Sequence, residues 1–191
     1  MTRVSRLVTL PNVLTASRIV LAPVFLELYL RGDTVRALAA FAAAAATDVL
    51  DGLAARVLRQ YTRLGAFLDP IADKFLAACA LFALWQRGRL PLWLPLLVIS
   101  RDAAQLLGAA ALRWLRREIP VAPTRIGKYA TFSIAATVVL SLAAEFLAWP
   151  AQQVMPVVAA LGLIAAQCVA VSWFQYFLYF VRSARVPADS G

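Results

Sequence analysis

The sequence predicts an all-α integral membrane protein, a six-transmembrane-helix bundle with both termini in the cytoplasm. Hydrophobic residues make up 62% of the 191-residue chain and the mean hydropathy is +0.75, which exceeds what a soluble domain of this length carries. Six apolar runs approach the roughly 20 residues that a membrane-spanning helix needs. Because no extramembrane segment is left over, we expect residues 1–191 to form a single membrane domain.

The six predicted spans cover residues 10–30, 34–57, 67–86, 91–113, 128–148 and 153–181. Residues 1–10 mix basic and apolar positions, which is typical of a short interfacial helix. Pro11 suits the first turn of the first span. The second span is rich in alanine over residues 39–46, and small residues allow membrane helices to pack closely. A tight turn over residues 56–64 joins the second and third spans and makes them antiparallel neighbours.

Positive charge predicts the orientation. With the N-terminus inside, the cytoplasmic segments hold Arg3, Arg6, Arg56, Arg59, Arg63, Arg113, Arg116, Arg117, Arg125, Lys128, Arg182 and Arg185. The outer loops hold only Arg31, Arg36, Arg87 and Arg89. This asymmetry satisfies the positive-inside rule. The net charge of +9 is split among short loops, so it indicates contact with anionic lipid and argues against a nucleic-acid partner.

Four aspartates interrupt the apolar sequence of the second and third spans: Asp48, Asp51, Asp69 and Asp73. Each aspartate near the middle of a bilayer costs about 2.5–3.5 kcal/mol on insertion scales. They must therefore be paired, hydrated or bound to cations. Spacings of three and four residues place each pair on one face of its helix, and the tight turn brings the two pairs together near the cytoplasmic interface.

The ligand types favour a hard cation. The chain has no histidine, and oxygen-only ligands select Mg²⁺ or Mn²⁺ over Zn²⁺. Magnesium bound by carboxylates usually completes its shell with water and substrate phosphates, and Arg56 supplies a guanidinium suited to phosphate oxygens. The competing interpretation is a buried ion-pair network between the aspartates and neighbouring arginines. We rank it lower because desolvation makes such networks poor stabilisers.

Two glycines flank the carboxylates. Gly52 and Gly65 lack side chains where a ligand would approach the backbone. Helix packing explains each of them equally well.

The run Asp48-Val-Leu-Asp51-Gly52-Leu-Ala-Ala55-Arg56, followed after eight residues by Gly65-Ala-Phe-Leu-Asp69-Pro-Ile-Ala-Asp73, resembles the signature of the CDP-alcohol phosphatidyltransferases without a gap or substitution. The first span is similar as well, in Pro11-Asn12-x-Leu14-Thr15-x-x-Arg18. The resemblance implies transfer of a phosphatidyl group from CDP-diacylglycerol to an alcohol, with release of CMP. It also implies a homodimer. We expect a multi-pass protein of a bacterial inner membrane whose active site faces the cytoplasm.

The resemblance also implies roles for residues. Asp48, Asp51, Asp69 and Asp73 would hold a two-metal centre of Mg²⁺ or Mn²⁺, and Asp73 would be the general base. The CDP moiety would be bound by Asp51, Gly52, Arg56 and Thr62. No nucleophilic Ser, Cys or His is evident, so direct transfer is favoured over a covalent intermediate.

Two acceptor alcohols compete on the basis of the sequence. A phosphate-bearing acceptor such as glycerol 3-phosphate needs a basic pocket, for which Arg101, Arg125, Lys128 and Arg182 are candidates. Glycerol 3-phosphate is our preferred acceptor, because Gly127-Lys128-x-x-Thr131 and the block from Gly65 to Lys74 look like phosphatidylglycerophosphate synthases. The run Ile99-Ser100-Arg101-Asp102 looks more like CDP-dependent cardiolipin synthases, whose acceptor is phosphatidylglycerol. The adjacent charges of Arg101 and Asp102 have a second interpretation, mutual compensation within the membrane.

Two other classes compete. Intramembrane prenyltransferases also bind a diphosphate through magnesium, but they are longer and lack the Gly52-x-x-Ala55-Arg56 continuation. A non-enzymatic divalent-cation carrier would place its carboxylates near the midplane between discontinuous helices, whereas these cluster at the cytoplasmic ends of two predicted helices.

Overall fold

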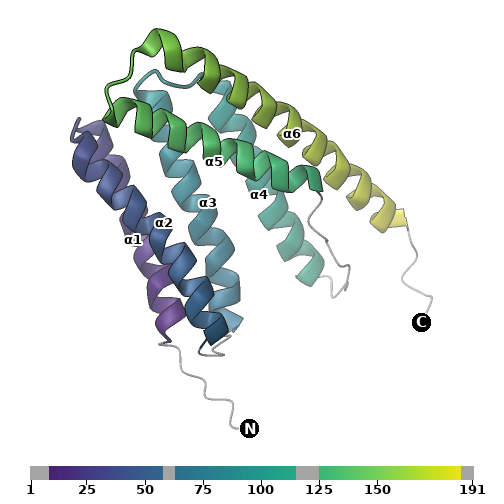
Figure 1. Ribbon diagram of the computed structural model, residues 1–191. Coiled ribbons are helices and arrows are strands. Elements are labelled where there is room, and N and C mark those ends of the chain that lie inside the picture. The colour runs from purple at the N-terminus through teal and green to yellow at the C-terminus, as the bar shows by residue number, and fades with distance from the viewer. Residues whose placement is uncertain (1–8, 58–62, 115–124, 186–191) are drawn as a thin grey trace. The chain divides into compact units, whose positions relative to one another are not determined.

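A computed structural model of the chain describes residues 9–57, 63–114 and 125–185. Within these ranges the chain is entirely helical apart from its turns. The helices are α1 (Leu10–Leu30), α2 (Thr34–Val57), α3 (Arg63–Gln86), α4 (Trp93–Trp114), α5 (Arg125–Phe146) and α6 (Ala151–Arg185) (Figure 1). All six predicted spans are thus helices, and the first two have the predicted bounds. The predicted interfacial helix over residues 1–10 falls almost wholly outside the described residues.

Four of these helices contain stretches long and apolar enough to cross a membrane: Asn12–Leu30, Thr34–Ala54, Ile126–Phe146 and Gln152–Gln175. The other two helices carry charge inside their apolar sequence. Helix α3 contains Asp69, Asp73 and Lys74, and α4 contains the adjacent pair Arg101 and Asp102. A membrane protein is therefore supported by composition and helix length, while the count of six spans and the orientation stay predictions.

The chain divides into two compact units. Unit 1 takes the residues up to Arg89 together with Leu142–Trp149, and unit 2 takes Leu90–Ser141 and the residues from Pro150 onward. In unit 1, α1 packs against both α2 and α3, and the three lie side by side in Figure 1. In unit 2, α4 packs against α6. The single-domain organisation stays a prediction.

One face of α1 is buried along its length. Its buried residues Thr15, Arg18, Ala22, Phe25 and Tyr29 recur at steps of three and four, so they form one stripe along the helix. Because α1 contacts α2 and α3 and no other helix as closely in the described residues, this stripe lies at the centre of unit 1. A charged arginine therefore occupies a position that helix periodicity assigns to the core.

Helix α2 meets α1 through small residues. Ala37, Ala44 and Asp51, each seven residues apart, are buried, whereas Ala39, Ala43 and most other members of the alanine-rich run are exposed or half-buried. The prediction of close packing is thus confirmed for one face of α2 only. The same face carries Asp51, so the packing seam leads directly to a carboxylate.

The turn between α1 and α2 makes these helices antiparallel neighbours. Gly32 has φ +88°, its N–H donates to the carbonyl of Tyr29 at 3.0 Å, and the N–H of Asp33 donates to the carbonyl of Leu28 at 3.0 Å. This is the Schellman arrangement that ends many helices, with glycine in the left-handed conformation. The carboxylate of Asp33 then accepts a hydrogen bond from the N–H of Arg36 at 3.2 Å in the first turn of α2.

The same arrangement ends α3 and α5. Gly88 has φ +67°, and Ala148 adopts φ +49° in the equivalent position after α5. The N–H of Arg89 donates to the carbonyl of Leu84 at 2.8 Å, and that of Trp149 donates to the carbonyl of Ala144 at 2.9 Å. An alanine in the left-handed region is strained where a glycine is not.

Glu145 ties the end of α5 to the rest of unit 1. Its carboxylate accepts a hydrogen bond from the hydroxyl of Tyr29 and lies 3.9 Å from Arg87 and 3.6 Å from Arg89. Arg87 also donates to the carbonyl of Tyr29 at 2.8 Å and lies over its ring. This network lies in unit 1 at the C-terminal ends of α1 and α3.

Candidate functional site

Helix lengths bring Arg18, Asp51 and Asp69 to similar levels in unit 1. Asp51 lies six residues before the end of α2, and Asp69 lies six residues after the start of α3. At 1.5 Å per residue each is about 9 Å from the helix end. Arg18 lies eight residues, about 12 Å, into α1. Carboxylate oxygens of Asp48, Asp51 and Asp69 lie within 4.8 Å of one another. The predicted convergence of the two aspartate pairs thus holds for these three residues, which we call the Asp triad.

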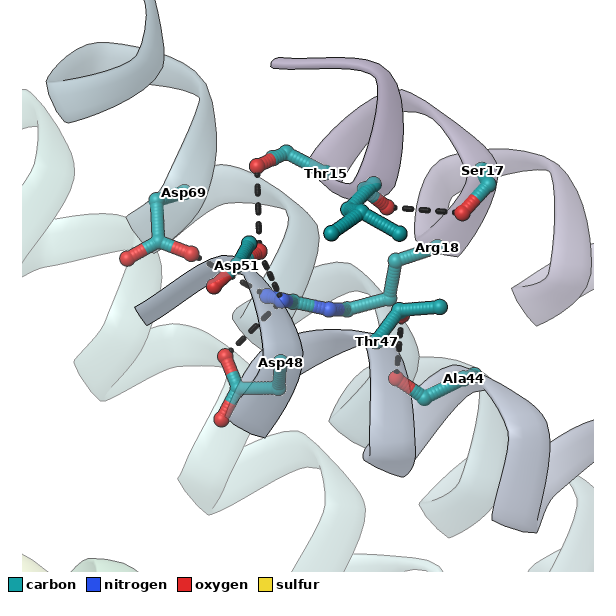
Figure 2. A network of polar contacts seen from close by, with 9 residues as sticks. Thr15, Ser17, Arg18, Ala44, Thr47, Asp48, Asp51 and Asp69 are labelled. Carbon is teal, nitrogen blue, oxygen red and sulfur yellow. Dashed lines mark hydrogen bonds and ion pairs between the residues drawn. The ribbon is translucent and has the colours of Figure 1, made fainter. Parts of the chain in front are cut away.

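The guanidinium of Arg18 lies among the three carboxylates, as Figure 2 shows. Its Nη2 atom is 2.6 Å from Oδ2 of Asp51 and 2.9 Å from Oδ1 of Asp48. Its Nη1 atom is 3.2 Å from Oδ1 of Asp69. One arginine of α1 thus forms ion pairs with carboxylates of α2 and α3 together. The ion-pair network that we ranked lower from the sequence is present here.

Burial differs sharply between the arginine and its partners. The side chain of Arg18 is fully buried, whereas those of Asp48 and Asp69 are 51% and 52% exposed. Asp51 is buried. The guanidinium therefore forms the inner wall of the site, and two of the three carboxylates remain open on the side away from it.

Thr15 adds a second contact from α1. Its hydroxyl donates to Oδ2 of Asp51 at 3.2 Å, one helical turn before Arg18. Two nearby hydroxyls, by contrast, bond within their own helices: Ser17 donates to the carbonyl of Leu14 and Thr47 to that of Ala44, both at 2.7 Å (Figure 2). Residue spacing did not assign a role to Thr15 or Arg18. The available signal was an arginine at a core position of an apolar helix, where an unpaired charge is costly.

The Asp triad has the donor set of a hard-cation site. One carboxylate oxygen from each member lies within 4.8 Å of the others, and oxygen ligands suit magnesium, calcium or manganese. The formal negative charge of three carboxylates exceeds the positive charge of one guanidinium by two, so the cluster still attracts a divalent cation. The residues therefore fit a metal ion, with Arg18 as a neighbouring positive charge.

Asp73 stands apart from the triad. It lies four residues after Asp69 on the same face of α3 and is exposed. Among the described residues it forms no ion pair with Arg18, unlike Asp48, Asp51 and Asp69. Of the four predicted metal ligands, Asp73 is therefore the one outside the ion pairs that Arg18 forms in the described residues.

The residues predicted to bind CDP differ in their exposure, and one of them lies outside the described residues. Gly52 lies on the exposed side of α2, and a Cβ added there would meet no atom within 4 Å among the described residues. Close helix packing in the described part of the chain therefore does not account for this glycine. Gly65 is half-buried near the start of α3. Arg56 lies in the last turn of α2, and Thr62 falls outside the described residues.

The acceptor candidates belong to unit 2. Arg101 is buried on α4, where Nη1 pairs with Asp102 at 2.8 Å and Nη2 donates to the hydroxyl of Ser172 on α6 at 3.4 Å. This supports mutual compensation between Arg101 and Asp102. Lys128 is exposed in the first turns of α5, where Arg125 is the first residue. Arg182 lies near the end of α6. Acceptor binding by these four residues stays a prediction.

Apolar helices of membrane-spanning length and an oxygen-only acidic site define a membrane protein that can hold a divalent cation within its helices. Comparison with known protein families identifies the family of this membrane protein. The chain belongs to the CDP-alcohol phosphatidyltransferase family, whose model matches residues 8–166.

Three similar proteins carry names of phospholipid-synthesising enzymes. A Mycobacterium tuberculosis protein named probable phosphatidylglycerophosphate synthase is 43% identical over 115 residues, which cover 57% of this chain and 53% of that protein. A Streptomyces coelicolor protein named cardiolipin synthase (CMP-forming) is 34% identical over 193 residues, covering 96% of this chain and 87% of that one. A Pseudomonas fluorescens CDP-diacylglycerol–glycerol-3-phosphate 3-phosphatidyltransferase is 48% identical over 94 residues, 47% of this chain and 48% of that protein. The matched segments span about half the length of the mycobacterial and pseudomonad relatives.

Proposed function

We propose that this protein transfers the phosphatidyl group of CDP-diacylglycerol to glycerol 3-phosphate and releases CMP. The observation that carries the proposal is the Asp triad, three carboxylates from two helices gathered within 4.8 Å in the segment that bears the family signature. The family match supports the reaction class. The names of the mycobacterial and pseudomonad relatives support glycerol 3-phosphate as the acceptor.

In the proposed reaction the acceptor hydroxyl attacks the phosphorus of the phosphatidyl group. A new phosphorus–oxygen bond forms, the diphosphate bond to CMP breaks, and the hydroxyl proton passes to a base. We assign that base to Asp73, which is exposed and free of the Arg18 ion pairs that hold the triad. A positioned carboxylate contributes about 10²–10⁴-fold as a general base.

The metal centre of the proposal is formed by Asp48, Asp51, Asp69 and Asp73, with two Mg²⁺ or Mn²⁺ ions. When bound, these ions supply neutralisation of the diphosphate and of the charge that develops on the leaving CMP. The half-exposed carboxylates of Asp48 and Asp69 support this assignment, since they retain room for ligands beyond Arg18.

The CDP moiety is assigned to Asp51, Gly52, Arg56 and Thr62. The open space at Gly52 supports it, because a bare backbone on the exposed face of α2 admits a ligand closely. We further assign Arg101, Arg125, Lys128 and Arg182 to the acceptor phosphate. Of these, the exposed Lys128 is the best supported, and Arg101 is engaged with Asp102 and Ser172.

The proposal includes a cellular setting. The protein is a homodimer in a bacterial inner membrane, with six spans, cytoplasmic termini and an active site that faces the cytoplasm. The positive-inside asymmetry of the loops supports this orientation. A site near the interface suits a reaction between a membrane lipid and a water-soluble phosphate.

A second acceptor has its own support. The streptomycete relative, which aligns with 96% of this chain, is named a cardiolipin synthase, and Ile99-Ser100-Arg101-Asp102 looks like that group. The alternative reaction uses phosphatidylglycerol as acceptor and also releases CMP.

An acceptor panel tests the proposal. Purified protein is incubated with labelled CDP-diacylglycerol, Mg²⁺ or Mn²⁺, and either glycerol 3-phosphate, phosphatidylglycerol, serine or inositol phosphate. We expect CMP release with glycerol 3-phosphate, loss of activity in EDTA and recovery on adding either metal. Conversion with phosphatidylglycerol alone selects the second acceptor. No conversion with any alcohol contradicts the enzymatic function.

A matched variant pair locates the site. Asp69→Asn is expected to abolish CMP release, while Glu27→Gln removes an exposed carboxylate that pairs only with Arg31 among the described residues and is expected to retain it. Full activity in Asp69→Asn contradicts the site assignment.

A further inference from the structure

We infer that Arg18 is a positioning residue for the metal centre. Its guanidinium holds one oxygen of each carboxylate of the Asp triad, and each carboxylate keeps a second oxygen outside these ion pairs. The inference rests on the proposed function, because it takes the triad to be the metal site. It assigns to α1 a part in metal binding although α1 supplies no carboxylate to the triad.

The contacts of Arg18 use one oxygen from each partner. They engage Oδ1 of Asp48, Oδ2 of Asp51 and Oδ1 of Asp69. A carboxylate has two oxygens and about four lone-pair sites. The ion pairs therefore leave a second oxygen on each residue, through which a carboxylate can bind a cation while it keeps its contact with Arg18.

The difference in burial between Arg18 and its partners indicates the side from which a cation can reach the carboxylates. Arg18 is fully buried and the side chains of Asp48 and Asp69 are half exposed. A cation from solvent thus meets the carboxylates on the side away from Arg18. It does not have to displace the guanidinium from its place between the helices.

Arg18 is held where it is by the triad. Its Nε atom is buried and has no hydrogen-bond partner in the described part of the chain, so its polar contacts there are made by the two terminal nitrogens. Burying an unpaired donor is unfavourable. That burial is tolerated because the charge-assisted contacts with three carboxylates are strong.

The positive charge of Arg18 reduces the electrostatic repulsion among the three carboxylates. Three carboxylates with oxygens within 4.8 Å repel one another, and a central guanidinium offsets that repulsion before any metal arrives. Thr15 assists by donating to the same Asp51 oxygen as Arg18. The site is therefore preformed, which lowers the cost of assembling it around a cation.

A guanidinium that competes with the metal and one that positions its ligands predict opposite effects of substitution on metal affinity. A guanidinium that merely occupied the cation site would compete with the metal, and removing it would tighten metal binding. A guanidinium that positions the ligands strengthens binding, and altering it weakens binding. Outer contacts to metal ligands typically change affinity about 10- to 100-fold.

The test measures Mn²⁺ binding by calorimetry and by the Mn²⁺ spin-resonance signal, in detergent-solubilised full-length protein without substrate. The variants are Arg18→Lys, which keeps the charge but loses the planar fork, and Thr15→Val, which removes one hydroxyl donor at nearly constant shape. The control is Arg31→Lys, the same change at the residue that directly follows α1, in an exposed pair with Glu27.

We expect Arg18→Lys to raise the Mn²⁺ dissociation constant by about 10- to 100-fold, Thr15→Val to raise it less, and Arg31→Lys to leave it unchanged. Unchanged or tighter binding in folded Arg18→Lys overturns the inference. If Arg18→Lys does not fold, Thr15→Val decides on the same criterion. Absence of saturable Mn²⁺ binding in the unaltered protein instead contradicts the metal site of the proposed function, so the two failures are distinguishable.

Discussion

The Nη2 atom of Arg18 lies 2.6 Å from Oδ2 of Asp51, and both residues are buried. This pair joins α1 to α2 at the level where α3 contributes Asp69. Breaking a buried ion pair by removing one partner strands the other charge, which costs about 3–5 kcal/mol.

Arg18→Met is therefore expected to destabilise the protein by about 3–5 kcal/mol in thermal or denaturant unfolding without added metal. Arg31→Met is the control, because the Arg31–Glu27 pair is mostly exposed and such pairs contribute under about 1 kcal/mol. Equal effects of the two substitutions would show that the buried pair is not a source of stability.

Asp51→Asn and Asp73→Asn are expected to differ in stability while both lower activity. Asp51 pairs with Arg18 and accepts from Thr15, so its replacement lowers both the unfolding temperature and kcat. Asp73 makes neither contact, so Asp73→Asn is expected to lower kcat by about 10²–10⁴-fold with stability within about 0.5 kcal/mol of the parent. Undiminished CMP release in Asp73→Asn excludes it as the base.

Gly52→Ala is expected to stabilise the protein and impair substrate binding. The new methyl group meets no described atom within 4 Å, and alanine is favoured over glycine in a helix by about 0.8–1 kcal/mol. Gly108→Ala in α4 is the matched control, since a Cβ there also meets no atom of the described residues within 4 Å. Both should gain stability, and only Gly52→Ala should raise the KM for CDP-diacylglycerol. An unchanged KM argues against close approach of CDP at Gly52.

Substitutions in the turns after α3 and α5 are expected to change stability in opposite directions. Ala148→Gly is expected to raise stability by about 0.5–1 kcal/mol, because Ala148 has φ +49° and glycine adopts this region without strain. Gly88 has φ +67°, and a new Cβ there meets no described atom within 4 Å. Gly88→Ala is therefore expected to lower stability by a similar amount. Unfolding temperatures measure both, and a gain in Gly88→Ala contradicts the strain argument.

Much of the fold follows from local sequence. Apolar runs of membrane-spanning length predicted six helices, because helix formation and burial depend on residues that are neighbours in the chain. The bounds of α1 and α2 agree with the prediction because Gly32 and Asp33 terminate one helix and begin the next. In α3 the helix starts at Arg63, four residues before the predicted span, because a helix can extend beyond the apolar part of its sequence.

The candidate site was predicted in part. Spacings of three and four residues placed the aspartates on two helix faces, and a short connection brought those helices together. Asp48, Asp51 and Asp69 do converge. The partner that they share, Arg18, lies 30 residues before Asp48 in the chain, and spacing within α2 and α3 carries no information about it.

The sequence by itself determined the helical membrane class, the family signature and the positions of the four aspartates. Only the tertiary structure decided that Arg18 and Thr15 of α1 reach the carboxylates, and that Asp73 stands outside their ion pairs. The physical reason is that periodicity within a helix fixes which residues share a face, whereas contact between helices depends on how each is rotated about its axis. In unit 1 the stripe of Ala22 and Phe25 sets that rotation for α1, and it turns Arg18 toward Asp51.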